Sequence, residues 1–393
     1  MSSTDNASLQ GALQGALAGL RVIDLTGVVL GPYATQILGD YGADVIKIEP
    51  PSGDIIRHAG PMKHPGMGHI FINANRNKRS VVLDLKQPEQ REQLLKLCKT
   101  ADVLTYNIRP AAMARLGLSY DMLHTINPRM VVCGAYGYSE GGPYSDWPAY
   151  DDLIQGAVGM PWLMTQSGSH EPRYAPTTFA DRVTGLNMVH AVMAAIIARY
   201  RTGVGQHVEV PMFECLLQFV MGEHLCGETW QPPLGPMGYA RLMAVNRKPY
   251  ATQDGHICAL MYNDTHWQAF LKFVGQPDLF QTDARFGTHA DRIQNIDALY
   301  GVVSQHMRTR TSAEWMKVLT ANDIPVMPMM KLDDLLTDPH LAATQGWLDI
   351  EHPFEGRLRQ LRPPVRMSGT PTGVWRPAPR LGEHTEEVLS ELR

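Results

Sequence analysis

Residues 20 to 49 show the first clear alternation of apolar and polar segments. The apolar run "LRVIDL" ends in a Gly-rich turn, Pro32 stands where the first turn of a helix tolerates proline, and "ADVIKIE" is a second apolar run. A strand, a helix and a second strand within about thirty residues form a βαβ unit. Its two strands must be parallel, because a helical crossover connects them.

The alternation continues to residue 138. Apolar runs at 80–85, 101–107 and 129–138 alternate with predicted helices at 88–100 and near 110–117. Alternating elements of this kind predict an α/β fold class with a doubly wound parallel sheet, in which ligands bind beyond the carboxyl ends of the strands. Those ends carry residues 26–30, 49–51, 107–109 and 136–139.

After residue 200 the pattern changes. "GQHVEVPMFECLLQFV" predicts a strand and a helix, "PYATQDGHICALMYNDTHWQAFLKFVG" a hairpin and a helix, and "TSAEWMKVLTANDIPVMPMM" a helix and a strand. We therefore expect two domains of unequal size, the smaller one α+β. The expected boundaries are a flexible tail at 1–19, a large domain at 20–200 completed by 380–393, a linker at 201–225, the smaller domain at 226–330 and a Pro-rich linker at 331–379.

The composition argues against several classes of protein. With 35 Lys and Arg against 39 Asp and Glu the net charge is −4, so the basic excess of nucleic-acid and membrane-surface binders is missing. The five cysteines show neither a C-x-x-C pair nor a metal-binding spacing, which favours a reducing cytosol. The first nineteen residues contain no Lys or Arg, and the longest apolar run, near 186–198, is too short to cross a bilayer. We therefore expect a soluble cytoplasmic protein without a bound metal.

Asp181 is the first candidate for chemistry. It is the one acidic residue at the start of the apolar helical run "ADRVTGLNMVHAVMAAI", which a Gly-rich turn closes. Aspartate is among the best N-cap residues, so Asp181 could simply begin the helix. A helix N-terminus also stabilises a carboxylate that does chemistry, so the two interpretations are compatible and the spacing does not separate them.

Basic residues gather near the predicted strand ends. Residues 76–79 precede one strand, Arg57 follows another, and Arg109 and Arg115 follow a third. A charge cluster is usually a solvated surface, but three clusters at the ends of one sheet could instead bind a phosphorylated ligand. The turn at 27–31 also has a structural and a phosphate-facing interpretation, because its glycines lack the G-x-G-x-x-G spacing of dinucleotide-binding folds.

Seven segments, in one order, resemble the class III coenzyme A transferases, the group of formyl-CoA:oxalate and carnitine CoA-transferases (CaiB/BaiF type). The resemblance covers nearly the whole chain, from Leu20 to Leu392. It implies a Rossmann-like large domain with a smaller α+β domain, and an interlocked homodimer in which each subunit is a ring threaded by the other. The segments are "LRVIDLTGVVLGPYATQILGDYGADVIKIEPPSGDIIR", "NANRNKRSVVLDLK", "ADVLTYNIRPAAMARLGL", "YGYSEGGPY", "ADRVTGLNMVHAVMAAI", "RTGVGQHVEVPMFE" and "LGEHTEEVL".

The resemblance also implies the activity and its residues. Such an enzyme moves CoA from an acyl-CoA donor, with succinyl-CoA as a candidate, to a small carboxylic or dicarboxylic acid. Asp181 would carry the acyl group as a mixed anhydride and then CoA as a thioester. CoA and acyl-CoA are substrates, no cofactor is permanently bound, and neither nucleic acid nor membrane is a partner. The positions that match the CoA-binding residues are Val29, Leu30, Asn75, Lys78, Asn107, Ile108, Arg109, Arg115, Tyr136, Gly137 and Tyr138, and we add Arg57 as a phosphate or adenine-side partner.

Departures from the family pattern bear on the reaction. Oxalate-type members have Gln where this chain has Val29 and Lys where it has Tyr136, which favours a larger acceptor such as a C4 or C5 dicarboxylate. An α-methylacyl-CoA racemase of the same fold would carry a His in a Gly-His-Asp segment near 148–152, but the residues here are "PAYDD". A nicotinamide-dependent oxidoreductase is the remaining alternative, and the glycine spacing at 27–31 argues against it.

Overall fold

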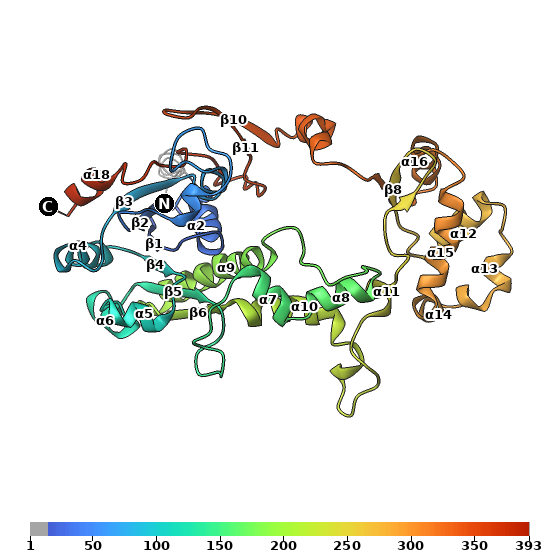
Figure 1. The fold of residues 1–393 in the computed structure, drawn as a ribbon, viewed down its shortest axis with the longest axis horizontal. Helices are drawn as coiled ribbons and strands as arrows, with labels where there is room; N and C mark the ends of the chain where they lie inside the picture. Colours follow the sequence, from blue (N-terminus) through green and yellow to red (C-terminus); the bar gives the residue numbers. More distant parts are fainter. Residues whose placement is uncertain (1–14, 393) are drawn as a thin grey trace, which may run out of the picture. The chain divides into compact units, whose positions relative to one another are not determined.

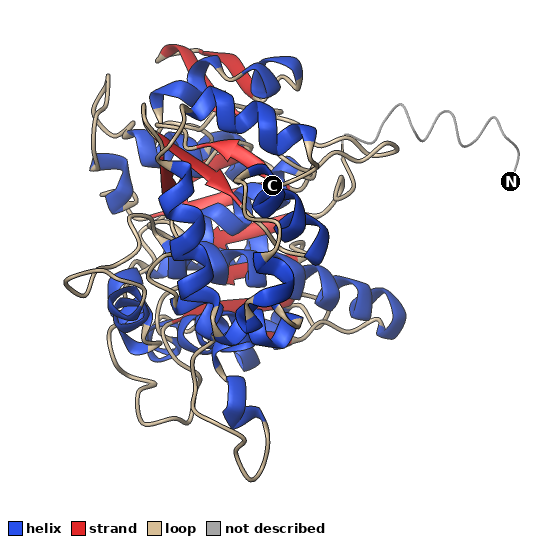
Figure 2. Cartoon of the chain, turned by 90° about the vertical axis from the view of Figure 1, so that its right-hand side faces the viewer, coloured by secondary structure: helices blue, strands red, loops and turns tan. Residues whose placement is uncertain are grey.

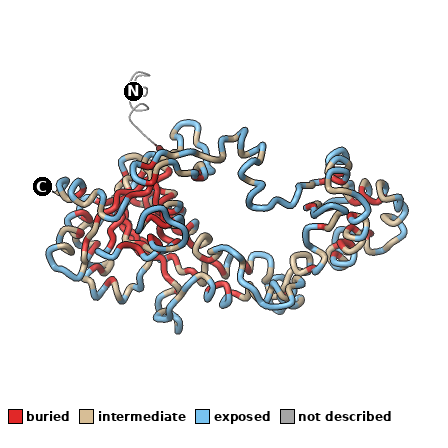
Figure 3. The backbone as a smooth tube through the Cα atoms, turned by 45° about the horizontal axis from the view of Figure 1, so that its top comes forward, coloured by how far each residue is buried: buried red, intermediate tan, exposed pale blue. Residues whose placement is uncertain are grey.

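The computed structural model describes residues 15–392, which divide into two compact units. The first comprises 15–158, 176–219 and 340–392, and the second comprises 159–175 and 220–339. Buried residues are concentrated separately in each unit (Figure 3). Of the predicted tail, residues 1–14 lie outside the described residues. Residues 15–19 form a turn, in which the amide of Leu17 donates to the carbonyl of Tyr41 over 2.8 Å.

A six-stranded parallel sheet forms the centre of the first unit (Figure 1). Its strand order is β3-β2-β1-β4-β5-β6, the arrangement of a doubly wound sheet, so the predicted α/β fold class is confirmed. The order reverses between β1 and β4, and a crevice is expected at that point. The strands are β1 (Arg21–Leu25), β2 (Asp44–Glu49), β3 (Lys78–Val82), β4 (Val103–Tyr106), β5 (Val131–Tyr136) and β6 (His207–Pro211).

The central strands are apolar along their whole length because helices cover both faces of the sheet. All residues of β4 and β5 are buried, as expected for parallel strands. Ile23 and Ile46 join one continuous apolar core with Leu94 and Leu123 of the covering helices. Two charged side chains interrupt the apolar pattern, since Asp24 of β1 and Lys47 of β2 are both fully buried. These belong to the network that supports the site.

The helices of the first unit alternate with its strands, and Figure 2 shows them in blue around the red strands. Among the described residues, α9 is the helix whose length and hydropathy would suffice to cross a membrane. It contacts α2, β5 and β6, so it is a covering helix of the sheet, and core helices meet the same criteria. The helices are α2 (Leu30–Asp40), η1 (Ile55–His58), α3 (His69–Ala74), α4 (Pro88–Cys98), α5 (Pro110–Arg115), α6 (Tyr120–Ile126), α7 (Asp151–Ala157), α9 (Phe179–Thr202), α10 (Met212–His224, which continues into the second unit) and α18 (Thr385–Ser390).

Two segments that we expected to be linkers have regular structure. Residues 201–225 supply β6, which pairs with β5, and α10. Residues 331–379 supply η4 (Asp333–Thr337), α17 (Pro339–Ala343) and the antiparallel pair β10 (Trp347–His352) and β11 (Gly356–Leu361). The hairpin is attached to the first unit, because Gln360 donates to the carbonyl of Ile72 over 2.9 Å. Both expectations are wrong for the same reason, which is that the contacts that order these segments come from distant parts of the chain.

The second unit is a small α+β assembly, as predicted. Its sheet is antiparallel in the order β7-β8-β9. Trp267, Phe270, Phe286 and Trp315 are fully buried at the centre of its apolar core. Its elements are α8 (Met160–Gln166), η2 (Cys226–Thr229), α11 (Ala240–Met243), β7 (Tyr250–Ala251), β8 (His256–Ala259), α12 (Asp264–Phe273), α13 (Leu279–Thr282), η3 (Ala284–Phe286), α14 (His289–Gln294), α15 (Ile296–Met307), α16 (Ser312–Ala321) and β9 (Val326–Pro328).

Candidate functional site

A cavity of about 890 Å³ opens at the carboxyl ends of the parallel strands. This volume is in the range of small-molecule binding sites. The cavity includes the ends of both β1 and β4, where the strand order reverses. Its walls are formed by residues 25–30, 47–50, 53–56, 70, 107–109, 112, 135–137 and 147–152 together with Thr178, Asp181 and Met212.

Asp181 lies in the wall of this cavity, in the first turn of α9. The helix begins at Phe179 and its N-cap is Thr178, so the N-cap interpretation of Asp181 is wrong. The side chain is half-buried, and among the described residues none donates a hydrogen bond to its carboxylate. Asp181 therefore presents an unbonded carboxylate at a helix N-terminus, where the amide dipoles favour negative charge.

A second carboxylate, Asp151, positions Asp181. The backbone amide of Asp181 donates to Oδ1 of Asp151 over 2.9 Å, and Oδ2 of Asp151 accepts from Gln155 over 2.5 Å. Asp151 thus caps α9 from outside that helix, because it begins α7 instead. Sequence reasoning missed this residue. The segment "PAYDD" drew attention only for its lack of histidine, although two adjacent carboxylates in a loop were the available signal.

Burial and charge both act on the Asp181 carboxyl. Its pKa is raised from 3.8 to about 7, first by burial and then by the nearby negative charge of Asp151. Arg182 opposes this shift, but its guanidinium lies over the ring of Tyr33, 4.3 Å from the ring centre. A carboxylate with a raised pKa is more basic and a better nucleophile than an ordinary one. The environment therefore suits Asp181 to attack a carbonyl carbon.

The turn between β1 and α2 forms the opposite part of the cavity wall. Val29 and Leu30 line the cavity, as does Ile108. The side chain of Asn107 accepts from the amide of Gly27 over 2.9 Å and donates to the carbonyl of the same residue over 2.8 Å. Asn107 therefore holds the turn with both ends of its amide group, and its side chain shapes the cavity in addition to lining it.

The remaining cavity wall brings together residues from β4 and β5. Arg109 is exposed at the cavity and donates to the carbonyl of Asp146 over 2.9 Å. Tyr136 and Gly137 line the cavity at the end of β5. A Cβ atom at Gly137 would lie 2.3 Å from the Cβ of Ala149, so only glycine allows the 147–152 loop to approach β5 this closely.

Tyr138 is outside the cavity wall. It is buried and packs against Tyr144 and Phe213, with ring centres 5.6 and 5.8 Å away. Its predicted role in binding CoA is therefore replaced by a role in packing the loop after β5 onto α10.

Lys78, predicted to bind CoA, is fully buried outside the cavity. Its ammonium group donates to the carboxylate of Asp24 over 3.1 Å, to the carbonyl of Pro32 over 2.9 Å and to Oδ1 of Asn75 over 2.8 Å. An ammonium has three donors, so none remains for a ligand. Asn75 is also fully buried, and its amide nitrogen donates to the carbonyl of Phe71. Both residues hold the first turn of α2 against β3, and the prediction that they touch CoA is corrected.

Arg57 and Arg115 do not line the cavity either. The guanidinium of Arg57 is 1% exposed, and it donates to both carboxylate oxygens of Glu49 over 2.7 Å and to the carbonyls of Gly66 and Pro379. Burial and full pairing make it an internal support. Arg115 lies exposed in the last turn of α5, so the structure does not bring it to the other predicted residues.

The basic cluster at 76–79 is neither a solvated surface nor an open phosphate site. Arg76 is paired with Asp40, and Arg79 with Asp44 and Glu391. Both arginine side chains are buried, so their charges are balanced inside the fold. A sequence shows that charges are present but does not show which of them face carboxylates.

Comparison with known proteins shows where the whole chain has counterparts. The model of the family described as CoA-transferase family III matches residues 17–385. The chain is 32% identical over 387 residues to the succinate–glutarate CoA-transferase of Agrobacterium fabrum, which covers 96% of this chain and 95% of that protein. It is 34% identical over 389 residues to the acetyl-CoA:oxalate CoA-transferase of Acetobacter aceti, with 96% of each covered. The crystal structure of a CaiB/BaiF family protein from Brucella suis superimposes with a TM-score of 0.81 at 30% identity, covering 97% of this chain and all of that one.

Proposed function

Because the chain belongs to CoA-transferase family III, we propose that it moves coenzyme A from an acyl-CoA donor to a small carboxylic or dicarboxylic acid, with Asp181 as the carrier. One observation supports this role above all others. Asp181 is a half-buried carboxylate in the wall of the strand-end cavity, its pKa is raised to about 7, and its oxygens accept no hydrogen bond from the described residues.

The proposed reaction has four steps of acyl transfer. A carboxylate oxygen of Asp181 attacks the thioester carbonyl, the C–S bond breaks, and a mixed anhydride and CoA thiolate form. The thiolate attacks the aspartyl carbonyl and releases the donor acid, leaving CoA as a thioester on Asp181. The acceptor carboxylate then attacks this thioester carbonyl, which gives a second anhydride and frees the thiolate. Finally the thiolate attacks the acceptor acyl carbon and regenerates the Asp181 carboxylate.

The burial of the site has a chemical purpose in this scheme. CoA transfer between two acids is nearly isoenergetic, so no external energy source is needed, but anhydride and thioester both hydrolyse in water. A partly closed cavity whose lining is mostly apolar limits the access of water to the intermediate. The same environment raises the pKa of Asp181 and so increases its reactivity.

For the acceptor we propose a C4 or C5 dicarboxylate, with succinyl-CoA as the donor. The relatives act on succinate and glutarate in one case and on oxalate in the other, by their names. Val29 and Tyr136, the two positions that depart from the oxalate-type pattern, both lie in the cavity wall. The racemase alternative has less support, because a proton shuttle of that family uses a histidine and the cavity wall contains none.

The proposal predicts a covalent mark on Asp181 during turnover. The protein is incubated with succinyl-CoA and glutarate, treated with borohydride or hydroxylamine, digested and analysed by mass spectrometry. We expect borohydride to reduce the aspartyl thioester to an alcohol and hydroxylamine to convert it to a hydroxamate, both at Asp181. A parallel sample with oxalate should give less new thioester than glutarate does. A mark on Asp151 or Asp152 instead, or no mark at all, would contradict the proposed carrier.

We also propose that two copies of the chain assemble. Leu186, Ile197 and Tyr200 of α9 are 50%, 53% and 67% exposed, and their spacing places them on one face of the helix. An apolar stripe on a helix that otherwise packs in the fold is typical of a surface covered by a partner. Analytical ultracentrifugation at micromolar concentration is expected to give the mass of a dimer, and a sedimenting mass of one chain would contradict this proposal.

A further inference from the structure

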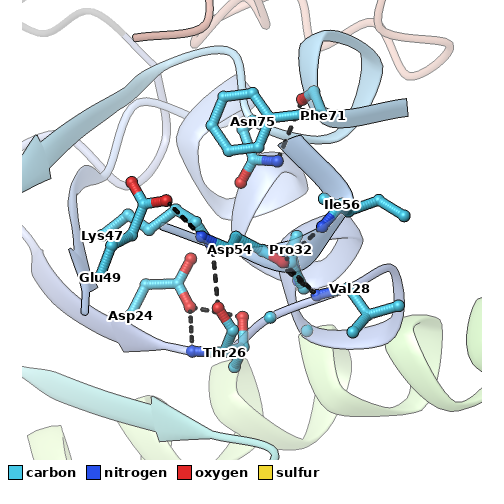
Figure 4. A network of polar contacts seen from close by, with 12 residues as sticks. Asp24, Thr26, Val28, Pro32, Lys47, Glu49, Asp54, Ile56, Phe71 and Asn75 are labelled. Atoms are coloured by element: carbon cyan, nitrogen blue, oxygen red, sulfur yellow. Dashed lines mark hydrogen bonds and ion pairs between the residues drawn. The ribbon is translucent and has the colours of Figure 1, made fainter. Parts of the chain in front are cut away.

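Side chains hold the peptide groups of the turn between β1 and α2 (Figure 4). The carbonyl of Thr26 accepts from the ammonium of Lys47 over 2.7 Å. The amide of Val28 donates to the carboxylate of Asp54, 3.0 Å from Oδ1 and 3.2 Å from Oδ2. Between them, Gly27 is held at both its amide and its carbonyl by the side chain described above. The conformation of this turn is therefore imposed by groups outside it.

The imposed conformation is an unfavourable one. Val28 has a φ angle of 67°, in the left-handed region. The other non-glycine residues in which the described chain adopts a positive φ are not β-branched: Asn77, Cys226, Asp323 and Gln345. A branched Cβ makes this region costly, and such strain persists only where the surroundings enforce it. Val28 lines the cavity and is 37% exposed, so the strained residue lies at the proposed site.

Asp54 is the residue that enforces it. Its side chain is 3% exposed and pairs with the ammonium of Lys47 over 3.0 Å. It also accepts from the amide of Ile56, at the start of η1. The amide of Asp54 donates to Glu49 over 3.1 Å, so the clamp is itself anchored to the end of β2. One buried carboxylate thus connects β2, η1 and the strained turn.

The turn is also in register with the helix that carries Asp181. A Cβ atom at Gly185 would lie 2.9 Å from the carbonyl oxygen of Leu30, so α9 and the start of α2 are in direct contact there. Gly185 is one helical turn after Asp181 and lies on the same face of α9. A displacement of the turn would therefore change the position of α2 against the first turn of α9.

We propose that Asp54 is a positioning residue for acyl-CoA binding. Its carboxylate, whose charge is balanced by Lys47, holds Val28 in the left-handed conformation, and this conformation places the turn that receives CoA against the helix that carries Asp181. Without the clamp, valine returns to a negative φ and the turn leaves the binding position. This inference rests on the proposed function, because it assumes that the cavity binds CoA.

The experiment combines removal of the clamp with relief of the strain. Asp54→Ala is expected to weaken CoA binding, measured by calorimetry, by about tenfold, the penalty for a strained backbone conformation that is no longer enforced. Adding Val28→Gly to Asp54→Ala is expected to restore most of this loss, because glycine adopts positive φ without a steric penalty. The melting temperature of both variants is recorded alongside. As a matched control, Asp283→Ala removes another aspartate that caps a short 3-10 helix, η3, and should leave CoA affinity unchanged.

The outcomes separate positioning from a purely structural role. A lower melting temperature without weaker CoA binding, or weaker binding that Val28→Gly does not improve, would overturn the inference. If Asp54→Ala does not fold, Asp54→Asn, which keeps the shape but not the charge that Lys47 requires, is measured in the same way. Failure of the unaltered protein to bind CoA would instead overturn the proposed function, so the two failures are distinguishable.

Discussion

Replacing Asp181 by alanine is expected to lower kcat/KM for CoA transfer by about 10⁴-fold or more, the scale seen when a covalent nucleophile is removed. Without the carboxylate neither the anhydride nor the aspartyl thioester can form, and the cavity offers no other unbonded carboxylate in the first turn of a helix. The cavity wall itself is otherwise intact. CoA affinity, measured by calorimetry, should therefore be retained while transfer from succinyl-CoA to glutarate is lost.

Two further variants make this result specific. Asp181→Asn keeps the shape of the side chain but removes its charge, and it should be as inactive as the alanine variant. Asp121→Ala removes an exposed aspartate from the first turn of another helix, α6, which does not border the cavity. It should transfer CoA at the unaltered rate. An Asp181→Ala protein that keeps activity within about tenfold of the unaltered protein would exclude covalent catalysis at this position.

The second large effect is a loss of activity in mild acid. Asp181 acts as a carboxylate, and its pKa is raised from 3.8 to about 7. Below pH 7 the protonated, unreactive form therefore dominates, and kcat/KM should fall tenfold for each pH unit. At pH 5 the expected rate is about 100-fold below the alkaline plateau. Initial rates between pH 5 and 9 measure this profile, and an acidic limb that begins only below pH 5 would show that Asp181 titrates as an ordinary carboxyl.

Asp151→Asn tests the cause of the shift. Asparagine can still accept the hydrogen bond from the amide of Asp181, but it removes the negative charge that helps to raise the pKa. The acidic limb of the profile should therefore move to lower pH, because less energy is needed to ionise Asp181. Since both proteins use the same substrates, the ratio of their profiles cancels any titration of the CoA phosphates. An unchanged limb would mean that burial alone sets the pKa.

Much of the sheet could be predicted because its signal is local. The expected strands at 20–25, 80–85, 101–107 and 129–138 correspond to β1, β3, β4 and β5, with ends displaced by a few residues. Buried parallel strands must be apolar on both faces, so each one is visible within a short window of sequence. The linker expected at 201–225 is wrong because β6 is ordered by its pairing with β5, in which His207 is next to Val132. No local window contains both partners.

The candidate site divides in the same way. Asp181 and the strand ends could be placed from the order of motifs along the chain, because a doubly wound sheet brings its strand ends to one edge. The residues that support them could not. Asp151 is 30 positions from the amide that it binds, and Asp54 is 26 positions from Val28. Hydrogen bonds across such intervals leave no periodicity in the sequence.

Charged residues show the limit most clearly. Lys78 and Arg57 have the composition and position of phosphate ligands, yet in the fold they face the buried carboxylates of Asp24 and Glu49. A cation near a strand end reads the same in a sequence whether its partner is a ligand or a carboxylate of the protein. Local apolar patterning and motif order were therefore sufficient for the sheet, the family resemblance and Asp181. The pairing of charges, the strained turn and the environment that raises the pKa of Asp181 exist only after folding, because each depends on side chains that the folded sheet brings together.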